Sequence, residues 1–154
     1  MLHDETRVDG FTAFVRDAEP RIRQALTASV GSEAAVDGTS EAIAYAWEHW
    51  DRVESMENAV GYLFVLARNH ARRTLRRRPP LLEPTRVELP WVEPGLTGAL
   101  RRLPERQRVA VMLVYCFDWT LAEVGDVLGL SRSTVQTHAE RGLVKLRRSL
   151  GVDL

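Results

Sequence analysis

The stretch from Trp119 to Arg148 constrains the fold most, because it carries the start and stop signals of two consecutive helices. Thr120 and Glu123 have the spacing of a capping box, in which a hydroxyl and a carboxylate each bind an otherwise free backbone N–H. The first helix is therefore predicted to begin near Leu121. Its apolar residues recur with the three-four spacing of a one-sided helix, and they are Leu121, Val124, Val127 and Leu128.

A sharp turn is predicted to follow this helix. Gly129 can adopt the left-handed conformation that ends a helix, and Ser131 is a good N-cap for a second helix beginning at Arg132. The apolar side of the second helix is expected to consist of Val135, Ala139, Gly142 and Leu146. Two short helices joined by such a turn form a helix-turn-helix, whose second helix can enter the major groove of DNA.

The opposite face of the second helix carries side chains that hydrogen-bond base edges and phosphates. These candidate DNA-binding residues are Arg132, Ser133, Gln136, Thr137 and Arg141. A solvated polar face on an ordinary helical hairpin would have similar spacing, so the pattern alone leaves both interpretations open.

The C-terminal third of the chain resembles region 4 of bacterial sigma factors, with the small extracytoplasmic-function type as the closest group. The matching segments are residues 103–108 (LPERQR), the apolar run to Tyr115, residues 120–125 (TLAEVG), residues 128–131 (LGLS) and Thr134-Val135. The resemblance implies that the five candidate residues above recognise the minus-thirty-five promoter element.

The charges of this chain balance overall but are distributed unevenly. With 21 basic and 21 acidic residues, no global field draws the protein to nucleic acid. However, residues 1–58 carry a net charge of minus seven, residues 59–78 carry plus six, and residues 97–154 carry plus three. This asymmetry predicts local basic surfaces beside an acidic one.

The segment from Ala59 to Arg78 is predicted to be a helix with an arginine-rich face. Its apolar stripe is expected to contain Val60, Phe64, Ala67, Ala71 and Leu75, and the far side Arg68, Asn69, Arg72, Arg73, Arg76 and Arg77. Many exposed helices carry a solvated basic face. Arginines without an intervening acid cannot form ion pairs within the helix, so the pattern favours nucleic acid binding.

Two further helices are predicted upstream. The first, Phe11 to Val30, contains Pro20 and is expected to break or kink near Glu19, since proline removes a helical hydrogen bond. Gly31 should end it, and a short helical piece should precede Gly38. The second, Thr39 to Arg52, is expected to bury Ile43, Ala46, Trp47 and Trp50.

These N-terminal helices resemble region 2 of the same sigma family. The supporting residues are Asp37, Glu41, Ala46-Trp47, Tyr62-Leu63, Ala67-Arg68-Asn69 and Arg76-Arg77-Arg78. The resemblance implies that Asp37, Glu41, Tyr45 and Glu48 bind the polymerase. It implies that the minus-ten element is bound by Tyr62, Arg68, Asn69, Arg72, Arg73 and Arg76. Binding there would require a cationic track for an unwound strand.

An all-α protein of two small domains is therefore expected. Five prolines between Pro79 and Gly95 cannot sustain a helix, so residues 79–96 are predicted to link an N-terminal domain (1–78) to a C-terminal helix-turn-helix domain (97–154). Within the latter, Thr97 to Leu103 should form a short helix, and Pro104 should begin the next.

Other features set the expected class and compartment. Cys116 is the only cysteine, which excludes an internal disulfide, and its apolar neighbours place it in the expected core. The longest apolar run is too short to cross a bilayer, and no signal peptide is apparent, so a cytoplasmic protein without membrane insertion is expected. The four histidines lack metal-ligand spacing and no phosphate-binding glycine loop appears, which predicts neither a cofactor nor an enzyme.

The predicted function is that of a sigma factor that directs core RNA polymerase to promoters. Its expected partners are promoter DNA and core RNA polymerase, bound through the clamp of the largest subunit and the flap, with an anti-sigma protein as a further candidate. Two alternatives remain open. One is a stand-alone helix-turn-helix regulator, which would bind duplex DNA without polymerase. The other is a sigma-like adaptor that no longer binds DNA.

Overall fold

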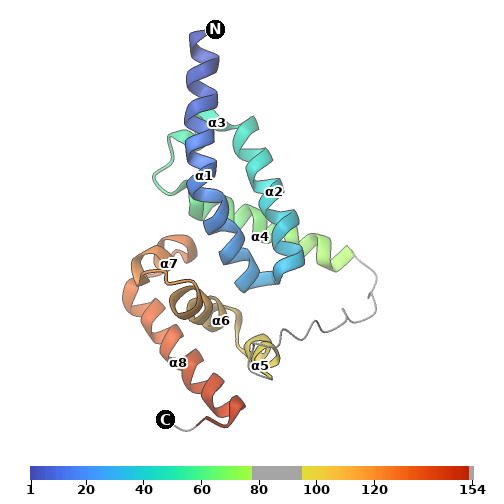
Figure 1. Cartoon of the computed structure of the whole chain (residues 1–154), viewed down its shortest axis with the longest axis vertical. Helices are drawn as coiled ribbons and strands as arrows, with labels where there is room; N and C mark the ends of the chain where they lie inside the picture. The colour runs from blue at the N-terminus through green and yellow to red at the C-terminus, as the bar shows by residue number, and fades with distance from the viewer. Residues whose placement is uncertain (78–94, 153–154) are drawn as a thin grey trace.

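The computed structural model describes residues 1–77 and 95–152, and these residues form helices without any strand (Figure 1). The predicted all-α fold class is thus confirmed. In chain order the elements are α1 (Leu2–Val30), α2 (Ser32–Glu48), α3 (Trp50–Glu54), α4 (Ala59–Arg77), α5 (Leu96–Arg102), α6 (Glu105–Val111), the π-helical turn η1 (Met112–Cys116), α7 (Leu121–Leu128) and α8 (Arg132–Leu150).

Helices α1, α2 and α4 pack against one another and form the N-terminal half of the molecule (Figure 1). Small buried residues allow the close approach of α2 and α4. A Cβ atom on Gly38 would lie 3.0 Å from the carbonyl oxygen of Ala67. The prediction that the chain breaks at Gly38 was wrong, because this glycine makes room for α4 inside a continuous helix that begins at Ser32. The expected helix to Arg52 is instead divided at His49 into α2 and α3.

Helix α1 is continuous through Pro20, so the predicted break near Glu19 was wrong. An internal proline costs a helix about 3 kcal/mol. Here the second half of α1 buries Ile22 and Leu26 completely. Each such side chain contributes roughly 1.5–3 kcal/mol when buried, which offsets the cost of the proline. Gly31 ends the helix as predicted, with a φ of 91°.

The predicted helix-turn-helix is confirmed in α7 and α8. The Thr120 hydroxyl accepts from the Glu123 backbone N–H at 3.1 Å, and the Glu123 carboxylate accepts from the Thr120 N–H at 2.8 Å. Gly129 is left-handed, with φ 67° and ψ 36°, and Ser131 caps α8 by accepting from the Thr134 N–H at 3.2 Å. Local sequence signals thus determine both ends of the turn.

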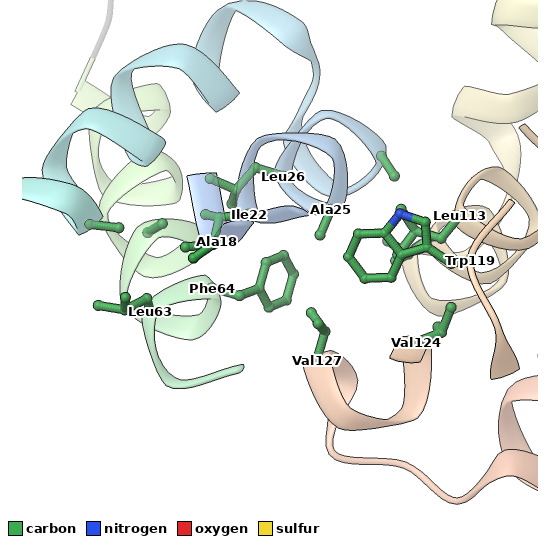
Figure 2. Close-up of a cluster of buried hydrophobic side chains, with 14 of the residues drawn as sticks. Ala18, Ile22, Ala25, Leu26, Leu63, Phe64, Leu113, Trp119, Val124 and Val127 are labelled. Carbon is green, nitrogen blue, oxygen red and sulfur yellow. The ribbon is translucent and has the colours of Figure 1, made fainter. Parts of the chain in front are cut away.

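The two halves of the molecule share one cluster of buried apolar side chains, drawn in Figure 2. Phe64 of α4 and Ala25 of α1 face Val127 of α7 and Trp119, which precedes it. The Trp119 indole N–H also donates to the Gln24 side-chain oxygen at 2.9 Å. Because the two halves share one core, the predicted boundaries between an N-terminal and a C-terminal domain remain a prediction. Of the predicted linker, residues 79–94 lie outside the described residues, and α5 begins at Leu96.

Three expected core residues are exposed. Cys116 lies on the surface at the end of η1, so its predicted burial was wrong. Leu75 is 44% exposed because it lies on α4 beyond Ala71, the last buried residue of that helix. Trp47 is 40% exposed and packs edge-on against Phe11, with ring centroids 5.0 Å apart. Trp50, in contrast, is buried as expected.

Candidate nucleic-acid interface

The candidate recognition residues lie on the exposed face of α8. Arg132, Ser133, Gln136, Thr137 and Arg141 are all exposed. The predicted apolar side is buried as a complete set, comprising Val135, Ala139, Gly142 and Leu146. The structure therefore brings the five predicted residues together on one solvent-facing surface.

Close packing against α6 fixes the position of α8. A Cβ atom on Gly142 would lie 2.7 Å from Cγ2 of Val111 and 3.2 Å from the carbonyl oxygen of Gln107. Only glycine permits this approach without displacing α6. A rigid platform of this kind holds side chains in a fixed orientation, which base readout requires.

Hydrogen bonds order the first turns of α8. The Ser131 hydroxyl lies 3.2 Å from that of Ser133, and the Thr137 hydroxyl donates to the Ser133 carbonyl oxygen at 3.0 Å. The Gln136 amide nitrogen donates to the Glu140 carboxylate at 3.0 Å. This last contact aligns the Gln136 side chain along the helix and leaves its amide oxygen as an acceptor.

A basic flank lies beside this face. Burial and then the nearby charges of Arg106 and Arg141 lower the pKa of His138, so these two guanidinium groups act on the same imidazole. Arg106 is exposed at the start of α6. It adds a positive charge on the side of α8 where His138 and Arg141 lie.

The arginine-rich helix α4 divides into a part that faces solvent and a part that contacts the C-terminal half. Asn69, Arg73 and Arg76 are exposed, and Tyr62 is 37% exposed. Two contacts orient Tyr62. Its hydroxyl lies 3.2 Å from the Tyr45 hydroxyl, and the Arg52 guanidinium lies 5.5 Å from the centre of its ring. These exposed side chains could contact a nucleic acid strand as the sequence predicts.

Arg68 and Arg72 form the part in contact with the C-terminal half, because both bind Glu105 at the start of α6, and their side chains are 28% and 39% exposed. Arg68 Nε and Nη2 donate to the two carboxylate oxygens of Glu105 at 2.6 and 2.8 Å. Arg72 Nη2 and the Ser29 hydroxyl also donate to this carboxylate. Burial opposes the charge of Glu105, but these hydrogen bonds and the two arginine charges lower its pKa to about 2. Glu105 is therefore an anion at neutral pH.

The candidate polymerase-binding residues lie along one stripe of α2. Their spacing of four, four and three residues places Asp37, Glu41, Tyr45 and Glu48 on the same side of the helix. The three acids are exposed and Tyr45 is half-buried. An Asp37 carboxylate oxygen lies 3.4 Å from His70 Nε2 on α4. The stripe forms an acidic surface opposite the buried side of α2.

Sequence reasoning missed the tertiary contacts of Glu105 and Arg108. The Arg108 guanidinium donates to the carbonyl oxygens of Ala28 and Ser29, each at 2.8 Å. No local pattern reveals either contact, because the partners lie more than thirty residues away in the chain. Within residues 1–77 and 95–152, no group of His, Cys, Asp or Glu has the arrangement of a metal site, and no helix is long and apolar enough to cross a membrane.

Comparisons with known proteins point to one family. Residues 96–146 match the family model described as Sigma-70, region 4. RNA polymerase sigma factor FliA of Pseudomonas aeruginosa is 38% identical over 56 residues, which cover 36% of this chain and 23% of the relative. The chain thus matches less than a quarter of the length of that curated relative. The sequence-based resemblance to the sigma-70 family is confirmed.

A solved structure has the same fold over nearly the whole chain. It is the sigma factor RpoE from Bartonella quintana, determined in complex with the anti-sigma factor NepR. The TM-score is 0.63 at 21% sequence identity, with 94% of this chain and 98% of that chain covered. This likeness confirms the all-helical fold beyond the region that the family model covers.

Proposed function

Because residues 96–146 match the family model of sigma-70 region 4, we propose that this chain is a sigma factor of the extracytoplasmic-function type. In this role it directs core RNA polymerase to promoters and performs no catalysis of its own. The observation that carries the proposal is the exposed polar face of α8, the second helix of the helix-turn-helix. The opposite face of α8 is buried.

Two DNA-binding surfaces follow from this proposal. The exposed face of α8 reads base edges of the minus-thirty-five element in the major groove through Arg132, Ser133, Gln136, Thr137 and Arg141. Arg106 binds a flanking phosphate. The minus-ten element is bound through α4, by Tyr62, Arg68, Asn69, Arg72, Arg73 and Arg76. Tyrosine provides a stacking surface for an unpaired base, and the arginines neutralise the strand's phosphates.

The acidic stripe on α2 is the proposed polymerase contact. Asp37, Glu41 and Glu48 are exposed there and Tyr45 lies between them, so the stripe suits a basic surface on the clamp of the largest subunit. The region 4 domain contacts the flap. We further propose the domain division 1–78, 79–96 and 97–154, a cytoplasmic location, and an anti-sigma protein as a regulator, because the RpoE structure contains one.

Run-off transcription with core RNA polymerase tests this function. The chain is incubated with core enzyme, the complex is isolated, and transcripts are read from a library of genomic fragments, with the chain omitted in the control. A sigma factor produces transcripts from a limited set of fragments that share two sequence elements. Binding to duplex DNA without any polymerase complex would instead support a stand-alone regulator, and binding to neither would support an adaptor.

A further inference from the structure

We propose that the structure is a closed state in which Glu105 occupies the minus-ten arginines in place of a DNA phosphate and so inhibits promoter binding. We call the contact of Glu105 with Arg68, Arg72 and Ser29 the Glu105 latch. The inference rests on the proposed function, because it takes Arg68 and Arg72 as DNA ligands.

The latch has the geometry with which arginine holds a phosphate. Arg68 presents two N–H groups to two oxygens of one anion, which is the bidentate arrangement common to carboxylate and phosphate recognition. Arg72 adds a second cation to the same carboxylate. The side chains of Arg68, Arg72 and Glu105 are 28%, 39% and 23% exposed, so a nucleic acid strand can approach the arginines but must displace Glu105 to take over its hydrogen bonds.

Other contacts hold the same two halves together. Asn58, which caps α4 by accepting from the Gly61 N–H at 3.0 Å, donates to the Asp126 carbonyl oxygen on α7 at 2.6 Å. Arg108 of α6 binds the last carbonyl groups of α1. Besides Arg68 and Arg72, the start of α4 and the end of α1 are therefore also in contact with the C-terminal half.

Promoter geometry requires these halves to separate. The names of the two elements place them about 25 base pairs apart, which is roughly 85 Å of duplex at 3.4 Å per base pair. A chain of contacts limits the distance between Arg72 on α4 and Arg132 on α8. Arg72 binds Glu105, and Gln107, two residues further along α6, packs on Gly142 of α8. Arg132 lies ten residues before Gly142 on the same helix. At 1.5 Å per helical residue, Arg72 and Arg132 are no more than about 40 Å apart. The closed state cannot contact both elements of a straight promoter at once.

The recognition face of α8 remains exposed in the closed state. The latch therefore occupies only Arg68 and Arg72 of the minus-ten surface and leaves duplex binding by α8 unaffected. This difference separates the Glu105 latch from a general loss or gain of affinity for DNA.

The test compares the full chain with Glu105→Gln, which keeps the size of the side chain but removes its charge. Spin labels on Cys116 and on an introduced Thr12→Cys report the distance between the halves, and fluorescence anisotropy reports binding of a labelled single-stranded oligonucleotide of about 12 nucleotides. Glu5→Gln, the same change at the exposed start of α1, is the matched control. Arg108→Gln weakens the same interface without touching Arg68 or Arg72.

In Glu105→Gln, a second, longer distance between the two spin labels is expected to appear. This variant should also bind the oligonucleotide about tenfold more tightly, with its affinity for duplex DNA unchanged. Two released arginines should steepen the dependence of log affinity on log salt by about 1.4. Arg108→Gln should act in the same direction, and Arg72→Ala added to Glu105→Gln should remove most of the gain while the long distance persists.

Two results would overturn the proposal in distinguishable ways. Unchanged distances and unchanged affinity in Glu105→Gln, with normal promoter-selective transcription by the wild type, would refute the latch and leave the sigma function intact. Separation of the halves without tighter binding would mean that Arg68 and Arg72 do not bind DNA, which removes both the latch and the minus-ten assignment.

Discussion

Specificity for the minus-thirty-five element should depend on single side chains of α8. Arg132→Ala or Gln136→Ala is expected to reduce discrimination between the native element and a scrambled one by about 1–3 kcal/mol, because each removes a base-edge contact. The ratio of run-off transcripts from the two templates measures this discrimination. Arg76→Ala on α4 serves as the contrast, since it should weaken both templates alike. An unchanged ratio in both α8 variants would contradict the assignment of the recognition helix.

The Glu105 carboxylate should also make stability depend on pH. Its pKa in the folded chain is about 2, below the ordinary value of 4.5, so its contribution is fully present above about pH 5 and is lost as the pH falls toward 2. The thermal midpoint of the wild type should therefore fall more steeply than that of Glu105→Gln between about pH 5 and pH 3. Parallel curves for the two proteins would show that the latch adds no stability.

At the scale of single elements, the turn between α7 and α8 depends on a glycine that has no room for a side chain. A Cβ on Gly125 would lie 2.5 Å from the Leu130 carbonyl oxygen, so Gly125→Ala should destabilise the chain by about 1–3 kcal/mol. Gly98→Ala in α5 is the matched control. Its nearest neighbour is the flexible end of Arg102 at 3.5 Å, and it should raise stability by up to about 1 kcal/mol. Urea unfolding of both variants provides the comparison, and equal effects would contradict the packing argument.

How far an element could be predicted depended on whether its determinants are local. Thr120, Glu123, Gly129 and Ser131 act within four residues of the groups that they bind, so the helix-turn-helix was predicted correctly from sequence. Gly38 was misinterpreted as a helix end. A side chain at this position would collide with the backbone of α4, and this tertiary contact cannot be read from the neighbouring sequence.

Pro20 was misinterpreted because burial elsewhere in α1 outweighs its local cost. The recognition face was likewise predictable from helical periodicity. The covered state of Arg68 and Arg72 was not, because it depends on Glu105, whose position follows from the tertiary fold.

At the scale of the whole molecule, a chain without net charge must bind DNA through local surfaces. The exposed face of α8 and the arginines of α4 are such surfaces, and in this structure one is accessible and the other partly covered. Under the proposed latch, α4 binds two anions in turn, the Glu105 carboxylate in the closed state and the DNA backbone in the open one.

The central claim is that one chain binds two separate DNA elements. Hydroxyl-radical footprinting of the polymerase complex on one selected promoter tests this claim most directly. The account predicts two chain-dependent protected stretches centred about 25 base pairs apart, with the upstream stretch weakened by Arg132→Ala and the downstream one by Arg76→Ala. A single protected stretch, or protection that neither variant changes, would contradict it.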